Sequence, residues 1–221
     1  MSDTEKIASV DTADSDAAST VRKRPKPGER RGQILQALGT MLEQPGAERV
    51  TTAALAAKLE VSEAALYRHF ASKAQMFEGL IEFIEQSVFT LVNQIIEREA
   101  ASGAAAADVG LRQVTRIVTM LMQFGEKNPG MTRVMVGDAL VFENERLQQR
   151  MNQFFDKIEA IFKQCLRPIS ETCGSASPTL DAQVRASVLT AFVAGRLQRF
   201  ARSGFKRVPS EHLDLSLQQI L

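Results

Sequence analysis

Several residue types that build catalytic or metal sites are scarce in this sequence of 221 residues, which has no tryptophan, one tyrosine, two cysteines and two histidines. Cys165 and Cys173 are not at metal-ligand spacing and have no histidine nearby, so we expect reduced thiols and no metal site. His69 and His212 are far apart, and the sequence contains no glycine-rich phosphate loop. We therefore expect a protein that is not an enzyme and holds no cofactor.

Long apolar runs are also absent. No stretch approaches the roughly 18–20 apolar residues that cross a bilayer, and the first thirty residues contain no apolar signal-peptide segment. Hydrophobic residues make up 44% of the chain and charged residues 24%, which are values typical of globular proteins. We expect a cytoplasmic protein with no membrane span and with enough residues to bury a core.

The net charge of +1 conceals an uneven distribution. Residues 1–20 carry five acidic side chains against Lys6, whereas residues 21–31 carry six basic side chains against Glu29. A charge asymmetry of this kind occurs beside nucleic-acid-binding modules, and a solvated tail whose charges cancel explains it equally well. Residues 1–27 have hardly any large apolar side chain, so we predict a disordered tail and basic arm there.

From Arg30 onward the apolar residues recur at steps of three and four, which indicates helices, and no convincing alternation of period two appears. We predict an all-α fold, with three short helices over residues 28–75 followed by a body of mostly longer helices over residues 76–221. After a first helix that stops at 44–46, helices are expected at 51–60, 63–70, 73–99, 111–126, 132–142, 143–167 and 180–203. Residues 101–108 and 167–178 are expected to be connections.

The strongest motif is a helix-turn-helix over residues 51–73. Thr51 or Thr52 can cap the first helix, and Ser62 can cap the second. Leu66 and Phe70 would face inward, which leaves Ser62, Ala65 and His69 on the opposite face. Small residues on that face suit a helix that enters the major groove, which is about 12 Å wide. A plain helical hairpin with a polar surface is the alternative.

The segment that follows favours the DNA-binding alternative. Ser72 and Gln75 are at the spacing of a capping box, and Lys73 lies at the same helix N-terminus. Unpaired N–H groups beside an ammonium make a natural phosphate clamp. Tyr67, Arg68 and His69 would then reach phosphates or base edges from the second helix.

Residues 51–80, "TTAALAAKLEVSEAALYRHFASKAQMFEGL", resemble the DNA-binding domain of the TetR family of transcriptional regulators. The family commonly has a glycine in the second helix, where this chain has Ala64 or Ala65. The resemblance implies that residues 28–75 form a three-helix DNA-binding domain and residues 76–221 a helical dimerisation and partner-binding domain. Its implied partners are double-stranded DNA and a second copy of the chain. It also implies DNA-binding roles for seven positions. Phosphate or backbone contacts are implied at Thr51, Thr52, Tyr67 and Lys73, and groove-facing positions at Ser62, Ala65 and His69. Arg68 joins them as a predicted DNA contact from its place on the second helix.

Three further segments resemble a nucleoid occlusion group within that family: "LIEFIEQS" (80–87), "QFGEKNPGMTRVMVGDAL" (123–140) and "FENERLQQRMNQFF" (142–155). This resemblance implies a nucleoid-associated protein that, when bound to chromosomal sites, inhibits cell division by antagonising assembly of the tubulin-like protein FtsZ. Leu91 stands where the group has a basic residue, and Gln123 where it has glycine. The positions that we predict to contact FtsZ are Phe83, Leu91, Gln123, Lys127 and Asn128.

Two alternatives concern the body. From the residues alone, ordinary core is the better explanation of Phe83, and an ordinary turn is the better explanation of residues 125–130. A ligand-responsive repressor of the same family is the alternative function.

For the homodimer, we predict a helical bundle built from two apolar faces, which comprise Leu147, Met151, Phe154, Phe155, Ile158 and Phe162 on one helix and Val184, Val188, Leu189, Phe192, Leu197 and Phe200 on the other.

Overall fold

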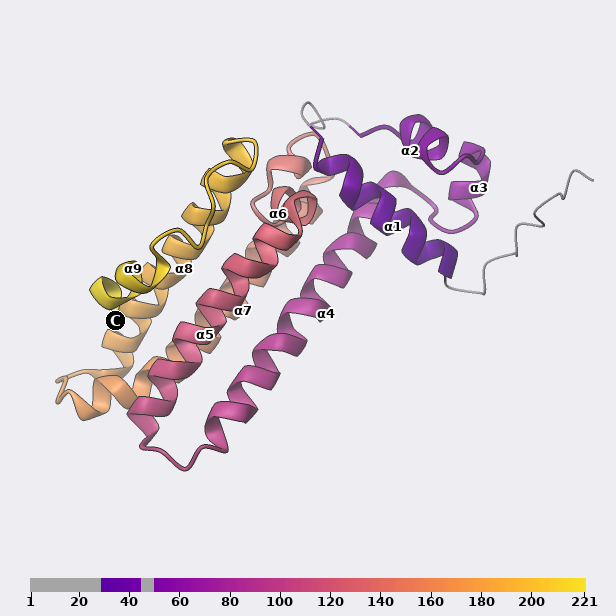
Figure 1. The fold of residues 1–221 in the computed structure, drawn as a ribbon. Helices are drawn as coiled ribbons and strands as arrows, with labels where there is room; N and C mark the ends of the chain where they lie inside the picture. The colour runs from indigo at the N-terminus through magenta and orange to yellow at the C-terminus, as the bar shows by residue number, and fades with distance from the viewer. Residues whose placement is uncertain (1–28, 45–49) are drawn as a thin grey trace, which may run out of the picture.

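The computed structural model describes residues 29–44 and 50–221, and the predicted tail and arm over residues 1–27 lie outside them. The described residues form helices and no strand, which confirms the all-α prediction (Figure 1). The α-helices are α1 (Glu29–Leu42), α2 (Thr52–Lys58), α3 (Glu63–Tyr67), α4 (Lys73–Ala100), α5 (Ala106–Lys127), α6 (Pro129–Met135), α7 (Glu145–Thr172), α8 (Pro178–Arg202) and α9 (Leu213–Ile220), with a 3-10 helix at Asp138–Leu140.

Helices α1 to α3 gather at the N-terminal end of α4 (Figure 1). Helix α1 buries Ile34, Leu38 and Leu42 against them, and α3 contributes Leu66. Phe70, 1% exposed, closes this small core, and the guanidinium of Arg31 lies 4.6 Å from the centre of its ring. The short helices α2 and α3 are thus held by apolar burial from neighbouring elements rather than by their own length.

The body consists of two antiparallel helix pairs, α4 with α5 and α7 with α8, and α5 also packs along α7 (Figure 1). Helix α9 returns along α8, where Arg196 donates hydrogen bonds to the carbonyl of Glu211 (2.7 Å) and to the hydroxyl of Ser216 (2.8 Å). The buried apolar residues form one cluster that runs from α1 to α9. The DNA-binding helices therefore share a core with the body, and the boundary predicted after residue 75 falls within the first turn of α4.

Four predicted elements differ from the observed ones. The connection predicted over 101–108 is too long, because α5 already begins at Ala106 instead of residue 111. The helix predicted over 63–70 ends at Tyr67, and the residues after it form a turn. The helix predicted over 132–142 ends at Met135, because Gly137 adopts a left-handed φ of 78° before the 3-10 helix. The loop predicted over 167–178 is wrong in its first part, since α7 continues through Pro168 to Thr172. Burial of Leu166 and Ser170 holds the helix together on both sides of the proline.

Two glycines allow helix backbones to approach closely. A Cβ atom on Gly110 would lie 2.1 Å from the carbonyl oxygen of Cys165, and one on Gly130 would lie 2.0 Å from that of Gly39. The first contact joins α5 to α7, and the second joins α6 to α1.

Both cysteines are free, and burial raises the pKa of the Cys165 thiol to about 11. That thiol stays protonated at neutral pH, which makes it a weak nucleophile.

Candidate nucleic-acid interface and a neighbouring groove

Two side-chain caps define the helix-turn-helix. The Thr51 hydroxyl accepts a hydrogen bond from the amide of Ala54 (3.1 Å), and the Ser62 hydroxyl accepts one from the amide of Ala65 (3.3 Å). Both predicted caps are confirmed, with Thr51 rather than Thr52 at the start of α2. The Thr52 hydroxyl instead donates to the carboxylate of Glu63 at 2.6 Å, which ties α2 to the first turn of α3.

The face that α3 turns to solvent carries most of the polar residues predicted from the sequence. Tyr67 is 45% exposed, Arg68 and His69 are also exposed, and Leu66 anchors the inner side. Each residue turns an α-helix by 100°, so the positions opposite Leu66 are two before it and two after it. Those positions are Ala64, which is exposed, and Arg68.

The prediction placed Ala65 on the outward face, but Ala65 is half-buried and lies beside Leu66. Ala64 is the small residue that faces outward. It was missed because Ala65 was placed opposite Leu66, although neighbouring residues lie only 100° apart around a helix. Ser62 is exposed, although its hydroxyl is engaged as the cap, and His69 lies in the turn after α3. A small side chain flanked by Tyr67 and Arg68 satisfies the steric requirement for entry into the major groove.

The N-terminus of α4 is also built largely as predicted. The Ser72 hydroxyl accepts from the amide of Gln75 (3.2 Å), while the Gln75 side chain accepts from the amide of Ala71 (2.8 Å) instead of that of Ser72. The ammonium of Lys73 is not free, because it pairs with the carboxylate of Glu143 at 2.5 Å. Lys73, which was predicted to contact a DNA phosphate, thus already pairs its ammonium with a carboxylate from the body.

Carboxyl groups with shifted pKa values lie away from this face. A hydrogen bond from Arg112 lowers the pKa of Glu99, and one from Ser170 lowers the pKa of Asp181. Glu99 lies in the last turn of α4 and Asp181 in the first turn of α8, and these helix ends lie at the end of the body opposite α3 (Figure 1). Within residues 29–44 and 50–221, no group of three or more histidine, cysteine or acidic side chains is arranged to hold a metal ion. None of the helices described is long and apolar enough to cross a membrane.

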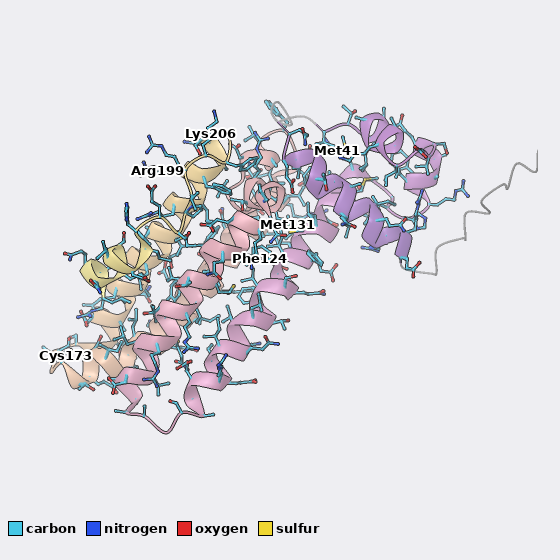
Figure 2. The ribbon with its side chains drawn as sticks, in the orientation of Figure 1. Met41, Phe124, Met131, Cys173, Arg199 and Lys206 are labelled. Carbon is cyan, nitrogen blue, oxygen red and sulfur yellow. The ribbon has the colours of Figure 1, made fainter. Side chains whose placement is uncertain are left out.

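A second feature adjoins the DNA-binding helices, namely a groove of about 490 Å³ between α1 and α4. Its apolar lining residues include Leu35 from α1, Leu80 from α4 and Met131 from α6 (Figure 2). Phe83 lines it with a side chain that is 48% exposed. The remaining lining residues are Gly32, Gln36, Gly39, Thr40, Glu43 and Asn128.

The groove brings together some of the residues predicted to contact a partner. Phe83 and Asn128 line it, and Lys127 is exposed directly beside Asn128. Leu91 and Gln123 are exposed as well, but neither is a lining residue. No local pattern indicated that α1 would supply one wall of the groove, because α1 and α4 meet only in the folded chain.

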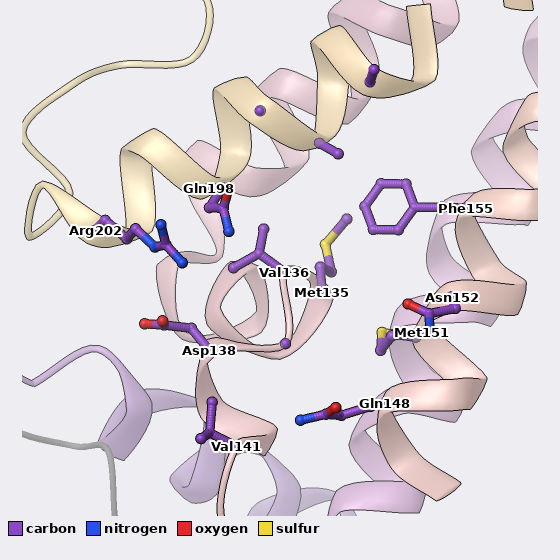
Figure 3. Close-up of a pocket in the computed structure, with 14 residues that line it drawn as sticks. Met135, Val136, Asp138, Val141, Gln148, Met151, Asn152, Phe155, Gln198 and Arg202 are labelled. Atoms are coloured by element: carbon purple, nitrogen blue, oxygen red, sulfur yellow. The ribbon is translucent and has the colours of Figure 1, made fainter. Parts of the chain in front are cut away.

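Another hollow, of about 540 Å³, opens between the end of α6, α7 and α8 (Figure 3). Met135, Met151 and Phe155 form its apolar side, and Asp138 and Arg202 stand at its edge (Figure 3). On α8 its wall continues into a stripe of exposed apolar side chains, which are Leu180 (64% exposed), Val184 (55%) and Val188 (50%).

Much of the predicted dimer bundle turns out to be internal to one subunit. The buried members are Leu147, Met151, Phe154, Ile158 and Phe162 on α7 and Leu189, Leu197 and Phe200 on α8. These side chains pack within one chain, which corrects the prediction that they face a second copy. Val184 and Val188 alone among the predicted α8 residues are exposed, since Phe192 is half-buried.

Two protein families match parts of the chain. Residues 34–80 match the family of bacterial regulatory proteins called the tetR family. Residues 109–221 match the SlmA-like tetracyclin repressor-like C-terminal domain. The first match covers the helix-turn-helix and the start of α4, and the second covers nearly all of α5 and the rest of the body.

Curated relatives span most of the chain. The nucleoid occlusion factor SlmA of Aliivibrio fischeri (strain MJ11) is 50% identical over 191 residues, which cover 86% of this chain and 93% of that protein. The nucleoid occlusion factor SlmA of Vibrio cholerae serotype O1 (strain El Tor Inaba N16961) is 47% identical over 186 residues, which cover 84% of this chain and 90% of that protein.

Solved structures share the fold at much lower sequence identity. The transcriptional regulator FadR of Bacillus subtilis, in complex with stearoyl-CoA, aligns with a TM-score of 0.65 at 14% identity, over 86% of this chain and 96% of that one. The TetR family regulator PfmR of Thermus thermophilus aligns with a TM-score of 0.64 at 17% identity, over 86% and 97% of the two chains. Such similarity establishes the architecture and says nothing about the ligand.

Proposed function

This chain belongs to the TetR family of bacterial regulatory proteins and carries its SlmA-like C-terminal domain, and we propose from this premise that it is a nucleoid occlusion factor. In this role it binds chromosomal DNA through α3 and, when bound, antagonises assembly of FtsZ. The observation that carries the proposal is the open groove beside the helix-turn-helix, in a chain about half identical to proteins named nucleoid occlusion factor.

The groove suits a short extended peptide with apolar side chains. Leu35, Leu80 and Met131 give it an apolar lining, and the exposed ring of Phe83 offers an anchor at its rim. The charges at the groove are of both signs, with Glu43 in its lining and Lys127 exposed beside it, so the apolar residues provide the main basis for recognition. One wall of the groove is α1 of the DNA-binding domain, and the other belongs to the body. A movement of α1 upon DNA binding would therefore change the width of the groove.

Binding of FtsZ is tested by replacing Phe83 with alanine. We expect Phe83→Ala to bind DNA as the wild type does and to lose at least about 1 kcal/mol of FtsZ affinity, the usual loss for an aromatic anchor. The measurement is co-sedimentation of FtsZ polymers with the protein, with and without a DNA duplex selected from a randomised library. Leu111→Ala, which truncates another exposed apolar side chain (42% exposed), serves as the control.

The same assay separates the two functions considered for this fold. A nucleoid occlusion factor reduces the FtsZ pellet when DNA is present and no small molecule has been added. A ligand-responsive repressor leaves the pellet unchanged, and its DNA affinity falls when its ligand binds. Equal behaviour of Phe83→Ala and the wild type would rule out the groove as the FtsZ site.

The exposed stripe on α8 supports a homodimer. Leu180, Val184 and Val188 recur every four residues. The exposed Ala191 follows on the same side of the helix and lines the adjoining hollow. A second copy packed on this stripe would cover the hollow and present two α3 helices to one duplex. We expect Val184→Glu to shift sedimentation equilibrium from dimer to monomer and to weaken DNA binding. A wild-type protein that sediments as a monomer at micromolar concentration would contradict the dimer.

A further inference from the structure

Three ion pairs join the first half of α4 to the start of α7 and to the turn just before it. They are Lys73–Glu143 at 2.5 Å, Glu85–Arg150 at 2.6 Å and Glu78–Arg146. In the second and third pairs the acidic residue is on α4. Only in the Lys73–Glu143 pair is the cation on α4. That cation is the first residue of α4, which follows α3 after a turn of a few residues.

Lys73 is held in a defined position. Its ammonium lies against Glu143 and 5.7 Å from the centre of the Phe77 ring, and its side chain is 29% exposed. The Glu143 side chain is only 10% exposed. Water therefore screens this pair less than a fully exposed one, and the carboxylate neutralises the cation in the free protein.

We propose that Glu143 competes with DNA phosphate for the ammonium of Lys73 and thereby weakens DNA binding. The inference rests on the proposed DNA-binding function and adds a residue of the body to the machinery that sets its affinity. One ammonium beside a helix N-terminus serves either a phosphate oxygen of the duplex or the carboxylate of Glu143. Each phosphate contact of Lys73 then requires that its pair with Glu143 be weakened or shared.

The competition has a signature in the salt dependence of binding. A lysine that neutralises a phosphate releases condensed cations from DNA and adds about 0.9 to the slope of log affinity against log salt. In the wild type, Glu143 loses its partner at the same moment and attracts a cation from solution, which offsets that release. Lys73 is therefore expected to contribute little to the slope as long as Glu143 is present.

The experiment compares Glu143→Gln with Glu145→Gln. Glu145 is exposed at the first position of α7 and makes no ion pair within the described part of the chain, so the control removes the same charge two residues away. Affinity is measured by fluorescence anisotropy on a labelled duplex of about 30 base pairs, long enough for two half-sites. We expect Glu143→Gln to bind roughly two- to fivefold more tightly and with a slope steeper by up to about 0.9. Glu145→Gln should change both much less.

A double-mutant cycle makes the test specific to the pair. In a Lys73→Gln background, Glu143→Gln should have no effect on affinity or slope. Glu143→Asp keeps the charge, but its shorter side chain holds the carboxylate farther from Lys73. It should therefore change affinity and slope in the same direction as Glu143→Gln, by a smaller amount. It also provides the measurement if Glu143→Gln fails to fold.

The outcomes separate this inference from the proposed function. Equal tightening by Glu145→Gln, or tightening that persists without Lys73, would overturn the competition while DNA binding itself stands. A wild-type protein that does not bind duplex DNA at low salt would overturn both.

Discussion

Gly130→Ala should lower the free energy of unfolding by about 1–3 kcal/mol, the range for overpacked sites, and should weaken DNA binding as well. The added Cβ would lie 2.0 Å from the carbonyl oxygen of Gly39 and 2.9 Å from its carbonyl carbon. Both atoms are backbone, so no side chain can rotate away, and α6 must move from α1. Arg133 of α6 also donates to the carbonyl of Leu42 at the end of α1 (3.2 Å), and that contact would lengthen with the shift.

Thermal unfolding followed by circular dichroism measures the effect, with Gly32→Ala as the control. Gly32 is an exposed position of α1 whose Cβ would meet nothing within 4 Å. Alanine there should stabilise the helix by up to about 1 kcal/mol, because it removes the conformational entropy of glycine. If Gly130→Ala proved as stable as the wild type, α1 and α6 would not be in the close contact described here.

Ala64→Glu should reduce DNA affinity by more than roughly 100-fold, because it places a negative charge and added bulk on the face of α3 that must approach the duplex. The fold should remain intact. Ala64 is exposed at the second position of α3, where the helix dipole favours an acidic side chain. Loss of binding could then not be attributed to unfolding.

Ala104→Glu makes the same chemical change in the exposed connection between α4 and α5, at the other end of the body (Figure 1). Binding of both variants to the selected duplex is measured by fluorescence anisotropy, alongside their melting temperatures. Comparable losses in the two variants would mean that net charge accounts for the effect. Unchanged binding by Ala64→Glu would show that another surface contacts DNA.

Local sequence signals predicted the parts of this protein that depend on short-range physics. Apolar spacing predicted helices, since a period of 3.6 residues is set by the backbone itself. Thr51, Ser62 and Ser72 were predicted as caps because a hydroxyl reaches an amide only a few residues along the chain. The exposure of Tyr67 and the family membership followed from the same segment.

Errors arose where packing between distant elements decided the outcome. The continuation of α7 past Pro168 depends on burial against neighbouring helices, which outweighs the hydrogen bond that proline cannot donate. The choice between Ala64 and Ala65 as the outward residue depends on how Leu66 enters the core. Assignment of Leu147 and Phe154 to a dimer face failed because an apolar stripe does not reveal whether its partner is another helix of the same chain or a second copy.

The sequence by itself determined the class of fold, the position of the helix-turn-helix and the family, because each is encoded in residues that are neighbours along the chain. Only the tertiary structure decided that Lys73 meets Glu143, that α1 forms a wall of the groove at Phe83, and that Gly130 touches Gly39. Those contacts join residues separated by many positions in the chain. They exist only because burial of one common core brings α1, α4, α6 and α7 together.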